Sequence, residues 1–267
     1  MKGRVLIIAG SDPSGGAGVQ ADIKTVTALG GYAAAAITAL TVQNTTGVSA
    51  VHPVDPAVIA AQIAAVLDDI GADAIKIGMI GDRASGAAIA DAIAFHATAI
   101  PVVIDPVLAA TSGDSLAGEG VAALILERLT PLAAVITPNA DEARALTGLC
   151  IENAAHLVAA GEALTRRGAT AALVKGGHLE GDFVEDVLVT QAGAEVFRAQ
   201  RINVRELHGT GCTLASAVAT GLAQGMPLRD SVVRAISYVQ GAIRHAPGLG
   251  AGASPLDHAY LAREKAG

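Results

Sequence analysis

The chain has 267 residues, a formal net charge of −7, and 52% hydrophobic, 16% charged and 2% aromatic residues. The negative charge, the absence of a basic cluster and the scarcity of rings for base stacking exclude a nucleic-acid-binding protein. The apolar content is ample for one large α/β domain, and no linker or repeat divides residues 1–267. No apolar stretch approaches the ~18 residues of a membrane span, and two cysteines without an export signal favour the reducing cytoplasm.

Short apolar runs alternate with amphipathic helical runs along the first two thirds of the chain. Strands are predicted at 4–10, 35–42, 74–79, 102–107, 133–138 and 171–176, and helices at 17–29, 56–70, 83–95, 118–129, 140–147 and 154–167. This alternation predicts an α/β fold, with a mostly parallel central sheet and helices on both faces. An antiparallel hairpin at 183–190 and 194–202 follows, and then helices at 213–224 and 228–245 and a last short helix.

Polar and glycine residues close or follow each of the six predicted strands. Ligands bind beyond the carboxyl ends of the strands in an open α/β sheet, so these positions predict one shared site. In chain order, the residues are Gly10 and Asp12, Gln43 and Asn44, Gly78 and Met79, Asp105, Asn139 and Glu142, and Lys175.

Several of these side chains have both a functional and a structural interpretation. The amide of Gln43 suits the edge of a heterocycle, or it belongs to a turn. Glu142 suits Mg²⁺, or it completes a capping box with Asn139. Asp22 lies on the first predicted helix, where a solvated face is the alternative. Lys175 leaves a buried strand into a Gly-Gly turn, which suits a phosphate contact.

The most informative motif is the turn Gly209-Thr210-Gly211, which leads through Cys212 into a helical pattern. Unpaired N–H groups and the helix dipole make such a junction an anion site, and the same field favours a thiolate. An anion site with a titratable thiol indicates phosphoryl transfer to a bound alcohol. The alternative is a tight turn followed by a small core cysteine.

Seven segments carry a more specific pattern, in order and with natural spacing: AGSDPSGGAGVQADIKT (9–25), TALTVQNT (38–45), KIGMI (76–80), DPV (105–107), TPNADEA (137–143), VKGGH (174–178) and HGTGCTL (208–214). Together they resemble the hydroxymethylpyrimidine kinase/phosphomethylpyrimidine kinase family of thiamine biosynthesis, in the ribokinase-like superfamily. The resemblance implies one ribokinase-like domain, ATP and Mg²⁺ as cofactors, and a homodimer. The expected substrates are 4-amino-5-hydroxymethyl-2-methylpyrimidine and then its monophosphate, which is converted to the pyrophosphate.

The resemblance also implies roles for the residues around the pyrimidine. Gln43 and Asp22 would hydrogen-bond the aminopyrimidine. Gly10, Met79 and Val107 would complete the substrate site, with Met79 and Val107 lining the apolar faces of the ring.

The phosphate-handling residues follow from the same resemblance. Asn139 and Glu142 would serve the Mg²⁺-phosphate region, and Asp105 would be a second metal carboxylate. Lys175 and Thr210 would contact the ATP phosphates.

The transfer itself would take place at the glycine turn. Gly209 and Gly211 would form the anion hole, with Lys175 beside them. Cys212 would occupy the place where the superfamily usually has an aspartate base.

Two departures and two alternatives accompany the resemblance. Thr111 stands where the family's lid commonly has a lysine, and Glu206 lies unexpectedly close to the phosphate region. A pyridoxal or pyridoxine kinase of the same superfamily is the main alternative, although residues 105–116 lack the second cysteine typical of that type. A non-catalytic pyrimidine-binding sensor is disfavoured by the joint presence of Glu142, Lys175 and Cys212.

Overall fold

Strands from the first three quarters of the chain join one sheet in the computed structural model, which describes residues 2–110, 113–114, 116–177, 179–204 and 206–264. Within these residues the strand order is β3-β2-β1-β4-β5-β6-β7-β8-β9. The strands are β1 (Arg4–Ser11), β2 (Tyr32–Asn44), β3 (Gly47–Pro53), β4 (Ala74–Ile77), β5 (Val102–Ile104), β6 (Ala133–Ile136), β7 (Ala172–Val174), β8 (Phe183–Thr190) and β9 (Gly193–Gln200).

The centre of the sheet is parallel, as predicted. β2, β1, β4, β5, β6 and β7 pair in parallel with their neighbours, so their carboxyl ends share one edge. The predicted hairpin of β8 and β9 extends this sheet antiparallel to β7. The polar residues that follow the six parallel strands are therefore brought to one side of the molecule.

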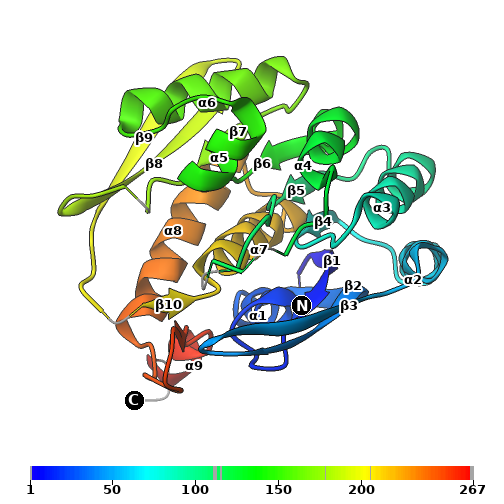
Figure 1. Cartoon of the computed structure of the whole chain (residues 1–267), viewed down its shortest axis with the longest axis horizontal. Coiled ribbons are helices and arrows are strands. Elements are labelled where there is room, and N and C mark those ends of the chain that lie inside the picture. The colour runs from blue at the N-terminus through cyan, green and yellow to red at the C-terminus, as the bar shows by residue number, and fades with distance from the viewer. Residues whose placement is uncertain (1, 111–112, 115, 178, 205, 265–267) are drawn as a thin grey trace.

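Helices cover both faces of the sheet. The central strand β1 has apolar side chains on both faces, and the helices bury them. Leu6 and Ile8 pack into one core cluster and Ile7 into the other. Figure 1 shows α1, α7 and α8 grouped on one face, with α2, α3, α5 and α6 on the opposite face. The helices are α1 (Gly18–Ala28), α2 (Pro56–Asp69), α3 (Arg83–His96), α5 (Ala140–Thr147), α6 (Ala154–Arg166), α7 (Thr210–Ala223), α8 (Leu228–Arg244) and α9 (Tyr260–Glu264). In the described part of the chain, none of the helices combines the length and apolarity needed to cross a membrane.

The structure differs from the sequence-based elements in three places. β3 was not expected; it pairs antiparallel with a longer β2 and forms the edge of the sheet. The predicted helix at 118–129 is a short α4 (Val121–Leu124) followed by a π turn at Ile125–Leu129. The small strand β10 (Leu207–His208), just before α7, pairs in parallel with β11 (Ser254–Pro255), which follows α8.

Glycine allows α7 to begin directly against the loop that follows β1. Gly209 precedes α7 with a φ of +85°, in the left-handed region. A Cβ atom at this position would lie 1.8 Å from the carbonyl oxygen of Gly16. The backbone therefore has no room for a side chain here, and the sharp turn aims the first amides of α7 at the carboxyl edge of the sheet.

A buried ion pair fixes α7 to the sheet about two turns further along the helix. The Lys76 ammonium lies 2.8 Å from an oxygen of Asp22, and both side chains are fully buried. The other Asp22 oxygen accepts a hydrogen bond of 2.6 Å from Ser216 on α7. Although burial opposes its charge, the anionic surroundings, chiefly Asp22, raise the pKa of Lys76 above its ordinary value. The pair thus joins β4, α1 and α7 through charge.

We expect Gly209→Ala to lower the free energy of unfolding by about 3 kcal/mol, because the methyl group adds a backbone clash to an unfavourable φ. Gly225→Ala is the control: its φ is +79°, but nothing lies within 4 Å of an added Cβ. Backbone strain alone should cost about 1 kcal/mol there. Urea unfolding of both variants measures the difference, and equal losses would contradict the close approach at Gly209.

We expect Lys76→Met to cost about 3–5 kcal/mol, because it leaves the Asp22 carboxylate buried without its cation. The double variant Lys76→Met/Asp22→Leu should recover much of this loss, since it removes both charges. Breaking the half-exposed pair of Arg4 and Asp73 by Arg4→Met should cost less than about 1 kcal/mol. Chemical denaturation checks all three values, and a double variant as unstable as the single one would refute the role of charge.

Candidate active site

The loop after β1 is organised around one carboxylate. Asp12 accepts hydrogen bonds from the backbone N–H groups of Ser14 (2.9 Å) and Ala17 (2.8 Å) and from the Ser14 hydroxyl (2.9 Å). Burial raises the pKa of Asp12, but hydrogen bonds from His208, Ser14 and Ala17 outweigh it and lower the pKa to about 2. Asp12 is therefore an anion at neutral pH, and it holds the loop in shape from within.

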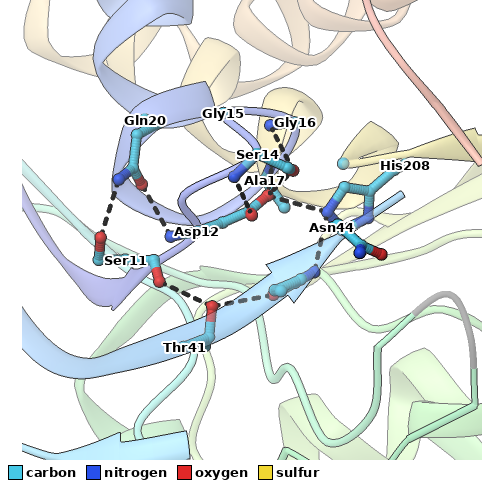
Figure 2. A network of polar contacts seen from close by, with 12 residues as sticks. Ser11, Asp12, Ser14, Gly15, Gly16, Ala17, Gln20, Thr41, Asn44 and His208 are labelled. Atoms are coloured by element: carbon cyan, nitrogen blue, oxygen red, sulfur yellow. Dashed lines mark hydrogen bonds and ion pairs between the residues drawn. The ribbon is translucent and has the colours of Figure 1, made fainter. Parts of the chain in front are cut away.

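The side chain of His208 lies against this loop, beside Asp12, as Figure 2 shows, and it also contacts the amide of Gln43. Nε2 of His208 lies 3.0 Å from Oδ2 of Asp12 and 3.0 Å from Nε2 of Gln43. The other end of the Gln43 amide lies 3.2 Å from the hydroxyl of Thr41, which also donates to the Ser11 carbonyl at 2.9 Å. Gln43 is thus held between β2 and β10, at a position where sequence alone also allowed a simple turn residue.

This amide faces a cavity of about 300 Å³ at the carboxyl edge of the sheet. Among the residues that line the cavity are Gln43, Asn44, Ala110, Glu206, His208 and Gly252. Glu206, whose position the sequence left unexplained, is therefore part of the cavity wall. The cavity is the size of a small heterocycle site.

Three further predicted substrate residues lie at the ends of β1, β4 and β5. A Cβ added to Gly10 would lie 2.9 Å from the Met79 sulfur, so these two residues are in direct contact. Met79 is nearly buried, and its carbonyl accepts a 2.7 Å hydrogen bond from Thr38. Val107 is partly exposed, and its N–H donates to the carbonyl of Asp105 at 2.8 Å.

Asp22 lies deeper than the predicted substrate contact requires. Its side chain is fully buried, and its two oxygens accept hydrogen bonds from Lys76 and Ser216. The alternative of a solvated helix face is therefore wrong. The helical position did not reveal this burial, because the partners of Asp22 come from β4 and α7.

The residues that were predicted to handle phosphate meet beside the start of α7. Nζ of Lys175 lies 2.9 Å from Asp105, and a Cβ on Gly211 would lie 2.9 Å from the same ammonium. Burial lowers the pKa of Lys175, but Asp105 and Glu142 outweigh it and hold the pKa above its ordinary value. Thr210 is the first residue of α7, whose N-terminus has no side-chain cap in the described structure. A lysine and uncapped helix amides together form an anion-binding corner.

Glu142 forms the capping box that the structural interpretation predicted, and its carboxyl group also remains a candidate ligand for Mg²⁺. The N–H of Asn139 donates to Glu142 at 2.8 Å, and the N–H of Glu142 donates to the Asn139 side chain at 2.9 Å. These two bonds are a capping box. Burial and the nearby Asp105 outweigh Lys175 and raise the pKa of Glu142 to about 7. No cluster of three metal-ligating side chains occurs among the described residues, but Mg²⁺ commonly uses only one or two carboxylates.

The sequence motif predicted that Cys212 is a thiolate at neutral pH. This prediction is wrong for the structure described. Cys212 lies in the first turn of α7 and is partly buried. Burial, reinforced by the carboxylates of Asp22 and Asp105, raises the pKa of the thiol to about 12. Lys76 lowers this pKa, but not enough to compensate. The effect of burial on the pKa is therefore larger than the effect of the helix N-terminus, and Cys212 is a neutral thiol at neutral pH.

Some site residues lie beyond what the sequence indicated or beyond what the structure describes. The sequence analysis assigned no role to Lys76, Thr41 or His208. Of these three, only Lys76 could have been found from the sequence, because it is a lone charge within an apolar strand. In the predicted lid, Thr111, Ser112 and Ser115 lie outside the described residues, as do His178 and Arg205 elsewhere in the chain.

Comparison with known sequences agrees with this geometry. A family model described as phosphomethylpyrimidine kinase matches residues 12–257. The chain is 47% identical over 264 residues to the thiamine biosynthesis bifunctional protein ThiED of Geobacter sulfurreducens, covering 98% of this chain but only 54% of that longer protein. It is 46% identical over 256 residues to the hydroxymethylpyrimidine/phosphomethylpyrimidine kinase of Rhizobium meliloti, covering 95% of this chain and 96% of that protein.

Solved structures share the fold. The pyridoxal kinase of Bacillus subtilis, in a complex with ADP, has a TM-score of 0.90 at 33% identity and covers 98% of this chain and 100% of its own. The phosphomethylpyrimidine kinase of Clostridium difficile has a TM-score of 0.80 at 38% identity and covers 91% of this chain and 100% of its own. The fold is therefore the expected ribokinase-like fold, and the relatives are phosphotransferases. The chain belongs to the phosphomethylpyrimidine kinase family.

Proposed function

We propose that this kinase uses ATP to phosphorylate 4-amino-5-hydroxymethyl-2-methylpyrimidine and then phosphorylates the monophosphate to the pyrophosphate. The observation that carries the proposal is the adjacency of two half-sites at the start of α7. His208, which touches Gln43 at the cavity, is followed directly by the glycine turn against Lys175 and Asp105. The name of the Rhizobium meliloti relative, hydroxymethylpyrimidine/phosphomethylpyrimidine kinase, supports the same substrates.

ATP and Mg²⁺ are the cofactors of this proposal. Lys175 and the first amides of α7, at Thr210 and Gly211, would bind phosphate oxygens. Glu142 and Asp105 would hold Mg²⁺, and the donor set fits because carboxylates and water are its preferred ligands. The cation would neutralise charge on the transferring phosphoryl group. Its arrival would also favour the ionised form of Glu142, whose pKa is raised to about 7 mainly by burial.

The residues of the chain position the alcohol and accept its proton. Gln43 would hold the pyrimidine, with Met79 and Val107 against its faces and Gly10 behind Met79. Gly209 and Gly211 would shape the anion hole around the transferring group. Cys212 would take the alcohol proton, and because its pKa is raised to about 12 by burial, only its small thiolate fraction is competent.

The assembly and location follow as further parts of the proposal. A homodimer is supported by apolar side chains on β2, the strand next to the edge strand β3, where Leu40 and Val42 are 51% and 50% exposed. A cytoplasmic location is supported by the two free cysteines, Cys150 and Cys212.

Pyridoxal kinase is the second candidate function. It is favoured by the TM-score of 0.90 to two pyridoxal kinases, from Bacillus subtilis and Staphylococcus aureus. The residues at 105–116 contain no cysteine, so a second thiol that could capture an aldehyde is missing from that segment. This difference favours the pyrimidine alcohol as substrate.

A substrate comparison tests the proposed function. We expect ATP-dependent release of ADP with 4-amino-5-hydroxymethyl-2-methylpyrimidine, and a higher kcat/KM for it than for pyridoxal. Mass spectrometry of the product should show the addition of one phosphate and then a second. A higher kcat/KM for pyridoxal would instead support the second candidate, and ADP release with neither compound would refute both.

The variant Cys212→Ala tests the proton acceptor. We expect it to lower kcat by roughly 10²- to 10⁴-fold and to leave the affinity for ATP largely intact. Because the thiol pKa is raised to about 12, the thiolate fraction grows as pH rises, so the wild-type kcat should increase from pH 8 to 10, above the range in which Glu142 ionises. This increase should disappear in Cys212→Ala and persist in Cys150→Ala, which alters the exposed cysteine. Unchanged turnover in Cys212→Ala would remove the thiol from the mechanism.

A further inference from the structure

The contacts around Gln43 contain a conflict between donors and acceptors. The ionised Asp12 can only accept, so Nε2 of His208 must carry the proton that points to it at 3.0 Å. The amide Nε2 of Gln43, which can only donate, lies 3.0 Å from the same ring nitrogen. At the other end, Thr41 has one hydroxyl proton but two acceptors, Gln43 and the Ser11 carbonyl.

Turning the Gln43 amide by half a rotation removes both conflicts at once. Its oxygen then shares the single N–H proton of His208 with Asp12, and its NH₂ group donates to the hydroxyl of Thr41. Thr41 is left free to give its single proton to Ser11, at 2.9 Å. The nitrogen and oxygen of an amide have nearly the same shape, so this assignment rests on the hydrogen-bond network.

We propose that His208 and Thr41 are specificity-determining residues that lock the Gln43 amide, with its oxygen toward His208 and its NH₂ group toward Thr41. The lock rests on the proposed function, because it concerns how Gln43 reads the substrate. A free glutamine can rotate and pair with either of two complementary ring edges. A locked glutamine presents its acceptor and donor in one order only.

That order distinguishes two closely related heterocycles. A 4-aminopyrimidine offers an NH₂ donor beside a ring-nitrogen acceptor, whereas the 4-oxo form offers a carbonyl acceptor beside a ring N–H donor. One fixed amide can pair with the first edge or the second, but it cannot pair with both. The lock therefore makes the enzyme reject the 4-oxo analogue, since a mismatch leaves buried polar groups unpaired.

The anchors of the lock are themselves rigid. Asp12, which orients His208, is held by three further hydrogen bonds within its own loop. The ring of His208 is packed so closely that a Cβ on Gly16 would lie 2.6 Å from its Cδ2. Thr41 is 8% exposed and lies in the interior of β2. Neither anchor can follow a rotating amide.

The test compares two substrates in matched variants. The measured quantity is the ratio of kcat/KM for 4-amino-5-hydroxymethyl-2-methylpyrimidine over its 4-oxo analogue. Thr41→Val keeps the shape but removes the hydroxyl, and Thr41→Ser keeps the hydroxyl. His208→Gln keeps a donor near the ring Nε2 position, and His208→Asn is too short to reach it. We expect the ratio to fall about tenfold or more in Thr41→Val and His208→Asn and to be retained in Thr41→Ser and His208→Gln.

Other measurements separate the lock from general damage to the fold. The KM for ATP should stay constant in all four variants, and thermal unfolding should confirm that each is folded. Gln43→Ala should raise KM for the pyrimidine alone; an equal rise in the KM for ATP would show that Gln43 is structural and overturn the lock.

Two results would overturn the inference in distinguishable ways. A wild-type ratio that persists in folded Thr41→Val and His208→Asn would refute the lock while leaving the proposed function intact. Wild-type enzyme that phosphorylates neither pyrimidine would refute the proposed function and the lock together.

Discussion

The contact between the start of α7 and the loop after β1 is the constraint on which the rest of the site depends. Gly209 and Gly16 approach so closely that neither backbone segment can shift without the other. The same contact pairs His208 with Asp12, and about two helical turns later Ser216 contacts Asp22. Because of it, the cavity wall, the uncapped helix amides and the thiol belong to one rigid unit, which is what positioned phosphoryl transfer requires.

Charge within this unit is balanced internally. Lys76 is neutralised by Asp22 and Lys175 by Asp105, so neither buried ammonium depends on a ligand for a counter-ion. Glu142 and Cys212 lie outside these two ion pairs, and burial shifts their pKa values. Burial raises the pKa of Cys212 to about 12, so the thiol is neutral at pH 7, and it raises the pKa of Glu142 to about 7, so this carboxyl group is close to its midpoint of titration. The site therefore has carboxylate and thiol groups whose ionisation responds to an added cation.

The features that could be predicted from the sequence are those that a local pattern of residues determines. Buried strands such as β4 and the turn before α7 are visible in composition and spacing, and so is the convergence of six strand ends. The protonation state of Cys212 is different, because it is set first by burial and then by charged groups from β4, α1 and the end of β5. His208 gave no signal, since its partner Asp12 lies 196 positions away. The edge strand β3, GVSAVHP, mixes glycine, polar and proline residues without clear alternation, so nothing local marks it.

The raised pKa of Cys212 has a consequence for the lifetime of the enzyme. Oxidants and electrophiles attack thiolates far faster than thiols, so a low-pKa cysteine in an accessible site is easily lost to sulfenic acid. Burial beside Asp22 and Asp105 keeps Cys212 protonated, and thus chemically inert between turnovers. An aspartate base needs no such protection. Burial that keeps this thiol neutral therefore slows its reaction with peroxide, compared with a thiolate at the same helix terminus.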